Sequence, residues 1–409
     1  MAHDGISPLL TPDGWALLAS LGPYRESDSL KLNESLRKAG HSPELVAAAL
    51  TQARLRAKAE AKFGEFARAM LFTPAGLEQA TRLSIAALHA QRFMAASITT
   101  VADLGCGLGA DSLAMASLDI AVTAVEVDEV TAACTTVNLM AFPHARVVCG
   151  RAEDQDVSDV AGIWLDPARR TTNTSGTTRL FDPEAFSPPL SFVEKLADSG
   201  KAVGVKMGPG IPHEAVPATA EAQWVSLNGD VVEAGLYFNA LARPGIRRAA
   251  LVMGVNGPHE LTSAVPYDPS GQNVETGPLA GYLYEPDGAV IRAGLVADLA
   301  RSMGAHLVDP HIAYLCSDNH VETPFARAYR VVEVKPFNVK ALKAWVKANR
   351  IGVLDIKKRG ISTTPEELRR QLLTGSGKGP NKATLILTRI GEDRVAVVVE
   401  PHGPAGHSA

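Results

Sequence analysis

The stretch from residue 100 to residue 128 constrains the fold of this chain more than any other part of its sequence. Its apolar lead-in Val101-Ala102 predicts a buried strand, and the following segment 105–109 carries a glycine at every second position. The residues from Asp111 onward predict a helix, and residues 122–126 predict a second strand that ends in an acid. Because a strand, a glycine turn, a helix and a strand follow one another, this stretch predicts the opening of an α/β sheet.

The glycine turn and the acid that follows it indicate the kind of ligand. Gly105, Gly107 and Gly109 allow backbone angles that are closed to other residues, and they let a ligand approach the main chain. Glu126 comes about 20 residues later at the tip of the next strand, where a carboxylate can accept hydrogen bonds from ribose hydroxyls. The spacing predicts a cofactor that contains a nucleoside. The run from Gly105 to Ala110 also fits the permissive G-x-G-x-x-A form of the dinucleotide fingerprint, which leaves a nicotinamide-dependent oxidoreductase as an alternative.

Length and composition indicate a soluble protein of more than one domain. A chain of 409 residues, of which 46% are hydrophobic and 21% charged, is expected to form two or three globular domains. No apolar run approaches the ~18 residues that a membrane span needs. The N-terminus lacks a basic region leading into an apolar one, so we expect no secretory signal. The four cysteines form no C-x-x-C pair, which favours a reduced, cytoplasmic protein.

The order of the predicted elements changes along the chain. Residues 1–96 predict an N-terminal helical region. Residues 97–255 alternate strands with helices, which predicts a mainly parallel sheet covered on both faces, with an antiparallel edge supplied by a hairpin within 223–253. Residues 256–327 begin with a stretch rich in Gly, Pro, Asn and Ser and predict a linker or insert. Residues 328–403 predict a basic α+β domain.

Polar residues follow several predicted strands at the point where each strand ends. They are the glycine turn, Glu126, the corner Ala152-Glu153-Asp154, and Asp166-Pro167. In an open α/β sheet, ligands bind outside the carboxyl ends of the strands, so we expect these residues to line one site. Lys206, at the tip of a fifth predicted strand, is expected to face the same cleft. There it would contact a substrate phosphate, stabilise the loop, or have a purely structural role.

This series of motifs resembles the class I S-adenosylmethionine-dependent methyltransferases over about residues 60–255. More narrowly, the chain resembles actinobacterial methyltransferases with a C-terminal THUMP-like domain. Four segments carry this resemblance: FTPAGLEQATR (72–82), DLGCGLGADSLA (103–114), LDPARR (165–170) and VKMGPGI (205–211). The THUMP-like part is similar through EVKPFNVKALKAW (333–345) and through the DIKKRG and GPNKA segments. The resemblance implies a Rossmann-like, seven-stranded α/β methyltransferase domain between a helical extension and a C-terminal α+β domain.

The resemblance also implies which residues bind S-adenosylmethionine. Asp103 and the three glycines of the turn would hold the methionine moiety, and Cys106 and Asp111 belong to the same expected set. Glu126 would bridge the ribose hydroxyls. Glu153 or Asp154, together with the backbone of Ala152, would bind the adenine edge. We expect no metal site, since His306, His311, Cys316 and His320 match no standard zinc spacing.

Asp166-Pro167 takes the position of the [DNS]-P-P-[FYW] motif of enzymes that methylate exocyclic amines. In that motif the side chain and the proline carbonyl accept hydrogen bonds from the amine and aim its lone pair at the sulfonium methyl. Here Ala168 and Arg169 stand where the family has proline and an aromatic. Arg169 and Arg170 can instead stack on a base or clamp a phosphate, and the alternative is a structural ion pair.

A basic C-terminal segment predicts a polyanionic partner. Residues 331–390 contain 13 Lys and Arg against 4 Asp and Glu, although the whole chain has a net charge of −4. The segment Lys335–Arg359, with its interleaved Phe337 and Trp345, and the run Lys378–Lys382 predict an RNA surface, and a solvated helical face is the alternative.

The sequence therefore predicts a methyltransferase that acts on a base amine, a guanine or adenine, of structured RNA such as rRNA or tRNA. The alternatives are a nicotinamide-dependent oxidoreductase and a non-catalytic RNA-binding protein that retains the cofactor pocket. The oligomeric state does not follow from the sequence.

Overall fold

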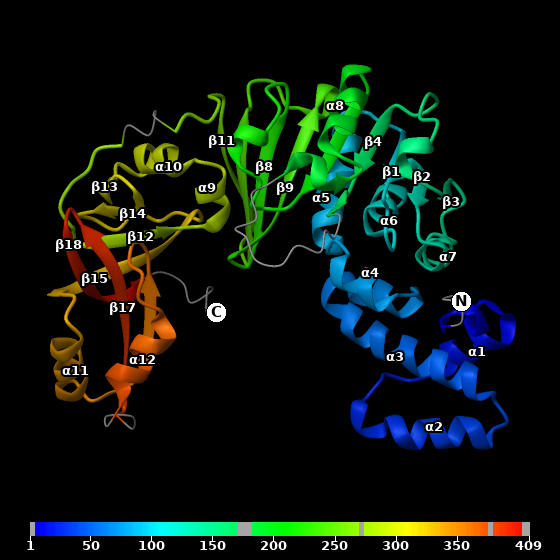
Figure 1. Cartoon of the computed structure of the whole chain (residues 1–409), viewed down its shortest axis with the longest axis horizontal. Helices are drawn as coiled ribbons and strands as arrows, with labels where there is room; N and C mark the ends of the chain where they lie inside the picture. Colours follow the sequence, from blue (N-terminus) through cyan, green and yellow to red (C-terminus); the bar gives the residue numbers. More distant parts are fainter. Residues whose placement is uncertain (1–4, 170–181, 270–273, 375–378, 403–409) are drawn as a thin grey trace. The chain divides into compact units, whose positions relative to one another are not determined.

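The structure, a computed structural model, describes residues 5–169, 182–269, 274–374 and 379–402. The chain divides into two compact units (Figure 1). The first consists of Met1–Met207, Pro217–Ala220 and Tyr237–Ala242, and the second consists of Gly208–Val216, Glu221–Leu236 and Arg243–Ala409. Within the described ranges, no helix combines the length and the apolar character needed to cross a membrane. The domain limits at residues 96, 255 and 327 stay predictions.

Helices precede the first strand, in agreement with the sequence. They are α1 (Pro12–Ser20), α2 (Ser29–Lys38), α3 (Pro43–Phe63), α4 (Pro74–Gln79) and α5 (Leu83–Ala95). The longest, α3, begins where Ser42 accepts a hydrogen bond from the N–H of Leu45 and ends at Gly64, whose φ of 56° only glycine adopts readily. Its buried residues Ala49 and Leu55 belong to one hydrophobic core with Leu17 of α1 and with Val101, so the N-terminal helices join the core of the first unit.

The first sheet has nine strands rather than the seven expected, in the order β11-β10-β8-β9-β7-β4-β1-β2-β3. Its strands are β1 (Thr100–Leu104), β2 (Ala121–Glu126), β3 (Ala145–Cys149), β4 (Gly162–Leu165), β7 (Ala202–Met207), β8 (Glu221–Leu227), β9 (Asp230–Phe238), β10 (Arg248–Gly254) and β11 (Gly257–Ser263). Strand β1 pairs in parallel with β2 on one side and with β4 on the other. Because the strand order reverses between β1 and β4, the carboxyl ends of these two strands form the switch point at which such sheets bind ligands.

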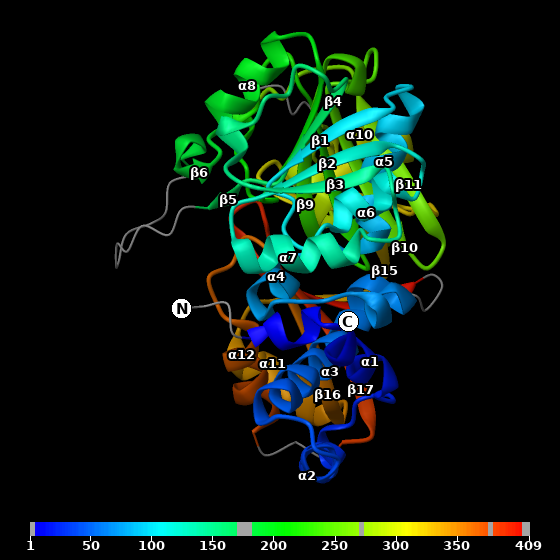
Figure 2. The ribbon, with the colours of Figure 1, turned by 90° about the vertical axis from the view of Figure 1, so that its right-hand side faces the viewer.

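Among the described residues of the first unit, three α-helices lie between its parallel strands. They are α6 (Ala110–Ala116), α7 (Glu129–Asn138) and α8 (Leu190–Asp198). Figure 2 shows α5, α6 and α7 gathered along β1, β2 and β3. The alternation of strand and helix is therefore the one that the sequence predicted. A short pair, β5 (Ala168–Arg169) and β6 (Phe186–Ser187), lies outside this sheet.

The antiparallel edge differs from the prediction. Strands β8 and β9 are joined by Asn228 and Gly229, whose φ angles of 53° and 93° are those of a two-residue hairpin turn. Strand β10 then pairs in parallel with β8, so residues 223–253 do not form the edge by themselves. The edge is β11, which pairs antiparallel with β10. It comes from a segment predicted as a boundary, where Asn256-Gly257 is a hairpin signal hidden among other loop-forming residues.

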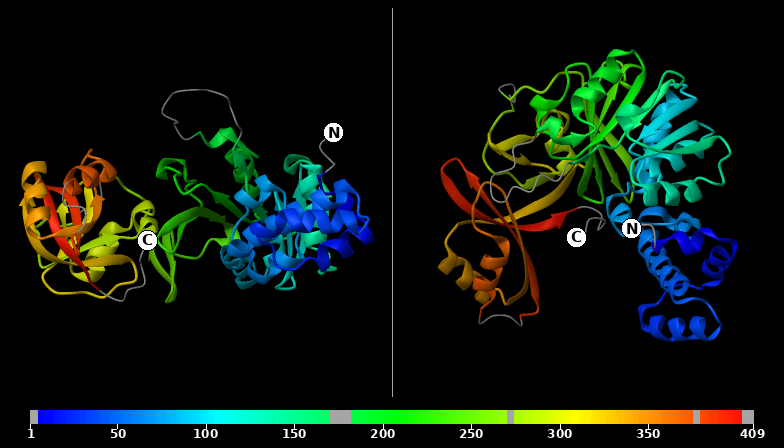
Figure 3. Two further views of the ribbon diagram at one scale, coloured as in Figure 1. Left: turned by 90° about the horizontal axis from the view of Figure 1, so that it is seen from below. Right: turned by 45° about the vertical axis from the view of Figure 1, so that its right-hand side comes forward.

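The second unit contains a separate sheet of seven strands, with the order β13-β14-β12-β15-β18-β17-β16. Its strands are β12 (Tyr282–Pro286), β13 (His306–Asp309), β14 (Ile312–Ser317), β15 (Ala326–Pro336), β16 (Ile351–Lys358), β17 (Asn381–Ile390) and β18 (Asp393–His402). The helices of this region are α9 (Gly288–Arg292), α10 (Val296–Met303), α11 (Val339–Ala348) and α12 (Pro365–Leu373). Figure 3 gives two further views of this region, whose strands and helices are drawn from yellow to red.

Strand β17 of this sheet is buried on both of its faces. On β17, Leu385 and Leu387 belong to a core shared with Leu342 of α11 and Leu368 of α12. Ile386, between them in sequence, belongs to a second core on the other face. Alternate residues of a strand point to opposite faces, so β17 serves two cores at once. The predicted α+β character of this region is confirmed.

Candidate functional site

In the glycine turn between β1 and α6, the first and last glycines pack against other residues and the middle glycine does not. Gly105, Gly107 and Gly109 all have positive φ, at 90°, 56° and 81°. A Cβ on Gly105 would lie 3.2 Å from the carbonyl oxygen of Asp166, and one on Gly109 would lie 2.8 Å from Cγ2 of Thr135. A Cβ on Gly107 would meet no atom within 4 Å. The central glycine therefore leaves the backbone open on the side where a ligand can approach it.

Glu126 connects this turn to the end of β2. One of its carboxylate oxygens accepts a hydrogen bond from the N–H of Gly107 at 3.0 Å, and the other accepts one from the N–H of Asp128 at 2.9 Å. Thr135 supports the same turn from α7 by donating its hydroxyl to the carbonyl of Gly107 at 2.5 Å. A carboxylate oxygen can accept more than one hydrogen bond, so this arrangement is compatible with the predicted contact to ribose.

Asp103, at the end of β1, presents a buried acceptor to the site. Its side chain is almost completely buried, and Ser112 donates its hydroxyl to Oδ2 at 2.5 Å. Oδ1 has no hydrogen-bond partner among the described residues. Burial, together with the neighbouring carboxylate of Asp111, raises the pKa of Asp103. A buried acceptor of this kind fits the amino group of a methionine moiety, which would donate to Oδ1 and stabilise the carboxylate form.

A buried histidine–carboxylate pair interacts with Asp103 through the charge of Asp111, and the sequence did not reveal it. His89 of α5 and Asp111 of α6 approach to 2.6 Å between Nδ1 and Oδ1, and both side chains are buried. The imidazole also packs on the ring of Trp164 with centroids 4.2 Å apart. Burial acts to raise the pKa of Asp111, but the charge and hydrogen bond of His89, together with Lys206 and Thr81, lower it overall. Asp111 thus has a structural partner within the protein.

The predicted catalytic residue Asp166 is bound to Lys206. The ammonium of Lys206, near the end of β7, donates to the Asp166 carboxylate just beyond β4. It also donates to the hydroxyl of Thr81 at 2.9 Å. Thr81 lies in the segment between α4 and α5 and is itself hydrogen-bonded to Asp111. The sequence left three roles open for Lys206. The structure shows that its ammonium contacts Asp166 at the end of the neighbouring strand β4.

The rest of the motif after β4 is described only in part. Pro167 is buried. Arg169 pairs through its backbone with Phe186 of β6. Arg170 and Lys378 lie outside the described residues, as does the greater part of the loop that follows Arg169. The predicted roles of Asp166, Pro167 and Arg169 in catalysis stay predictions.

The predicted adenine-binding corner forms a short 3-10 helix, Ala152–Asp154, just after β3. Arg151 pairs with both acids of this corner, at 3.2 Å from Glu153 and 3.8 Å from Asp154. The side chain of Glu153 is 23% exposed and that of Asp154 is 70% exposed. Glu153 is therefore the more enclosed of the two candidates, and its contact with adenine stays a prediction.

An extended segment before α4 is clamped against the turn. Gln52 of α3 donates to the carbonyl of Phe72 at 2.7 Å and accepts from its N–H at 3.0 Å. Asn138 of α7 does the same for Leu71, at 3.1 and 2.7 Å, and also donates to the carbonyl of Leu108 in the turn at 3.0 Å. Side chains thus satisfy the buried backbone of a segment that belongs to no sheet.

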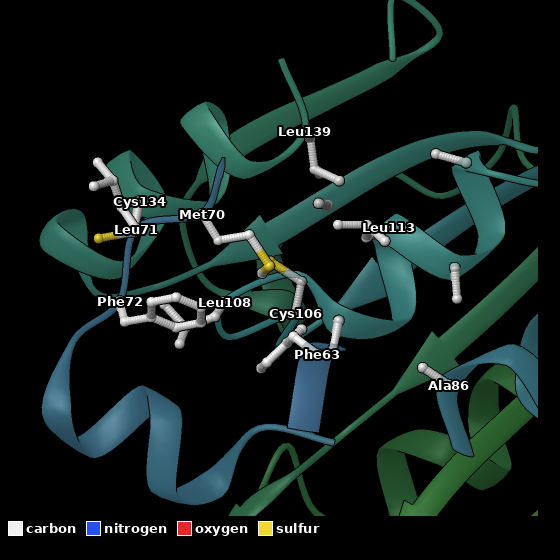
Figure 4. Packing of buried hydrophobic residues seen from close by; sticks show 14 of the residues in the cluster. Phe63, Met70, Leu71, Phe72, Ala86, Cys106, Leu108, Leu113, Cys134 and Leu139 are labelled. Carbon is white, nitrogen blue, oxygen red and sulfur yellow. The ribbon is translucent and has the colours of Figure 1, made fainter. Parts of the chain in front are cut away.

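The side chains of this segment complete the packing beneath the turn. Figure 4 shows Cys106 beside Met70, and Phe72 beside Leu108. Burial raises the pKa of the Cys106 thiol well above its usual value, so this cysteine remains a neutral thiol. Cys106 therefore acts as a small apolar residue that supports the turn rather than as a nucleophile.

Comparison with known proteins identifies the family. Over 347 residues the chain is 31% identical to an uncharacterised S-adenosylmethionine-dependent methyltransferase of Mycobacterium tuberculosis, found in strains CDC 1551 and H37Rv. The alignment covers 82% of this chain and 91% of that relative. The chain belongs to the S-adenosylmethionine-dependent methyltransferases. S-adenosylmethionine is therefore its cofactor, which removes the oxidoreductase that the glycine spacing alone had allowed.

Two further comparisons concern the ends of the chain and its fold. Residues 326–401 match the family model described as THUMP domain-like, and residues 2–59 match one described as a domain of unknown function, DUF8688. The crystal structure of a candidate methyltransferase from Porphyromonas gingivalis W83 is similar over 93% of this chain and all of its own, with a TM-score of 0.71. At 19% identity this likeness shows a shared fold.

Proposed function

We propose that this methyltransferase transfers a methyl group to a base amine of structured RNA, such as rRNA or tRNA, and that Asp166 binds the amine. The observation that carries the proposal is the place of Asp166. It follows β4 at the switch point of the sheet, and its carbonyl oxygen would be the nearest atom, at 3.2 Å, to a Cβ placed on Gly105 at the start of the glycine turn. A residue there would lie between a cofactor on the glycine turn and a substrate above the strand ends.

The bound cofactor supplies a methyl group on a sulfonium, and the residues of the chain supply alignment. The Asp166 carboxylate and the Pro167 carbonyl would accept hydrogen bonds from the two N–H groups of the amine. The lone pair of the nitrogen would then point toward the methyl carbon. Alignment of two reactants can by itself lower a barrier by roughly 7–11 kcal/mol. The proton released by the methylated nitrogen would pass to the Asp166 carboxylate or to water.

A row of exposed lysines supports RNA as the substrate class. Lys340, Lys343 and Lys347 are exposed on α11 and are spaced by three and four residues, so they share one face of the helix. We call these three residues the lysine row. Leu342 and Val346 are buried on the opposite side, in the core beneath α11. Regularly spaced cations on a rigid helix suit the phosphates of a nucleic-acid backbone.

Other cations of the predicted RNA segment have partners within the protein. Lys357 forms an ion pair with Glu285 at 2.7 Å, and Arg359 lies over the ring of Tyr314 at 5.6 Å. Beside the lysine row, a cavity of about 570 Å³ is lined by Lys335, Pro336, Asn338, Lys340, Ala341 and Ala344. These observations favour α11, rather than the 357–359 segment, as the centre of the RNA surface.

The test is methyl transfer from labelled S-adenosylmethionine to RNA, protein and metabolite fractions of cells that lack this protein. We expect label in RNA, in an N-methylated base after digestion to nucleosides. Asp166→Ala should lower that transfer by about a hundredfold or more, because the amine loses its alignment. The control is Asp159→Ala, which removes an exposed acid at the other end of β4. Label confined to protein or to metabolites would overturn the RNA substrate.

A further inference from the structure

Three carboxylates and two basic side chains meet at the switch point. They are Asp103, Asp111 and Asp166, with His89 and Lys206. Asp111 already has His89 as a partner. Asp166 differs from Asp111 because its predicted task is to accept a hydrogen bond from the substrate. It can do so only while its carboxylate is ionised, since a protonated acid turns one acceptor into a donor.

Two neighbouring charges act on Asp166 in opposite directions, the carboxylate of Asp103 and the ammonium of Lys206. Asp103 and Asp166 interact through their charges, and this interaction favours protonation of either carboxyl. The ammonium of Lys206 lies against Asp166 and favours its ionised form. Only 17% of the Lys206 side chain is exposed, so water screens this attraction weakly.

Thr81 fixes the position of this lysine. Its hydroxyl accepts a hydrogen bond from the Lys206 ammonium at 2.9 Å and also bonds to Asp111. The ammonium thus connects the predicted catalytic carboxylate to the buried His89–Asp111 pair through Thr81. Lys206 also interacts through its charge with Asp103, Asp111 and Lys62.

We propose that Lys206 is a positioning residue that keeps the Asp166 carboxylate ionised and aimed at the substrate amine, with Thr81 holding the lysine in place. This inference rests on the proposed role of Asp166. Lys206 acts through Asp166 and needs no contact with the methyl group or with the attacking nitrogen. Methyl transfer itself is unchanged: the nitrogen forms its new bond to carbon as the carbon–sulfur bond breaks.

The experiment compares Lys206→Met with Lys201→Met, using the pH dependence of kcat for methyl transfer to the RNA fraction. Lys201 precedes the opposite end of β7, where it donates to the carbonyls of Ser158 and Val160. Removing an adjacent opposite charge raises the pKa of a carboxyl by about 1–3 units. For Lys206→Met we therefore expect the acidic limb of the profile to move upward by about that amount, with activity partly recovered at high pH. Lys201→Met should keep the wild-type limb.

Two further variants separate charge from shape. Lys206→Arg keeps the positive charge and should keep the acidic limb near its wild-type position even if kcat falls. Thr81→Val keeps the ammonium but removes its fixed partner, so kcat should fall by about tenfold with little movement of the limb. Binding of S-adenosylhomocysteine, measured by calorimetry, should stay within a few-fold of wild type in all of these variants.

The outcomes distinguish this inference from the proposed function. If Asp166→Ala abolishes transfer while Lys206→Met behaves like Lys201→Met, the role of Lys206 is wrong and the role of Asp166 stands. If wild type transfers no methyl to RNA, or Asp166→Ala leaves the transfer unchanged, the proposed function fails first. A loss of activity in Lys206→Met that is equal at every pH would mean that the lysine only supports the local structure.

Discussion

The charged side chains at the switch point of the first sheet contrast with those of α11. At the switch point, the charges of Asp111, Asp166 and Lys206 are held by neighbouring side chains, and water reaches them only in part. On α11, the lysine row is exposed and makes no ion pair within the part of the chain that the structure describes. Buried charges lose their solvation and demand fixed partners, whereas exposed charges keep their water. We therefore expect the buried charges of the switch point to position reactants. We expect the exposed lysine row to attract a polyanionic partner.

The largest expected effect tests the buried side of this comparison. His89→Ala removes the partner of Asp111 and leaves a buried carboxylate without its counter-charge, which typically costs about 3–5 kcal/mol. Hydrogen exchange of peptides from β1 and α6 should show this loss of protection, and His41→Ala, at a partly exposed position, should not. A cost below about 1 kcal/mol for His89→Ala would show that the pair is not important for stability.

Asp103→Asn is expected to have an intermediate effect, raising the stability of the cofactor-free protein and lowering its affinity for S-adenosylhomocysteine. The pKa of Asp103 is raised in the folded protein, so its contribution to stability is present at low pH and is lost as pH rises through that raised value. Without cofactor, Asp103→Asn should therefore be more stable than wild type at pH 8, and the difference should shrink toward pH 5. Affinity for S-adenosylhomocysteine should fall, because a charge-assisted hydrogen bond of about 1.5–3 kcal/mol is lost.

Thermal unfolding at pH 5 and pH 8 measures the change in stability. Calorimetric titration measures the change in affinity for S-adenosylhomocysteine. Asp159→Asn, at an exposed acid, should change neither quantity. If Asp103→Asn bound the cofactor product as tightly as wild type, the assignment of Asp103 to the methionine moiety would be wrong.

The smallest effect at physiological salt is expected on the exposed side. Reversing the lysine row to glutamate should weaken RNA binding and reduce the slope of log affinity against log salt by about two to three, since each phosphate contact contributes roughly 0.7–0.9. Folding should be unaffected. The matched control reverses three exposed lysines elsewhere, Lys31, Lys38 and Lys195. Equal slopes for both triple variants and wild type would remove α11 from the RNA surface.

The sequence predicted the glycine turn and Glu126 because each leaves a local mark. Only glycine readily adopts the positive φ of Gly105, Gly107 and Gly109, and an acid ending the next strand is recognisable by its spacing. The order of strands and helices was also predictable, since hydrophobic periodicity records which residues are buried.

The partners of Asp111 and Asp166 were not predictable in the same way. His89 lies in a largely apolar helix, where nothing in the sequence marks it. Thr81 and Lys206, which form a hydrogen bond, are 125 residues apart in the sequence. A hydrogen bond between side chains of different elements depends on how those elements pack, and it changes neither periodicity nor turn chemistry. The edge strand β11 escaped prediction for a related reason, because its hairpin signal stood among other glycines and prolines.

The hydrogen bonds that α3 side chains make to the backbone of residues 70–72 determine how far the chain can be shortened from its N-terminus. Gln52, which pairs with both backbone groups of Phe72, lies within the match to the domain of unknown function, and so does Arg56, which donates to the carbonyl of Met70 at 2.8 Å. Proteolysis or gene truncation just before β1 would remove these side chains and the segment that they hold. We therefore expect the shortest form that folds by itself to begin before Pro43, since the N-terminal helices lie in the same compact unit as the glycine turn.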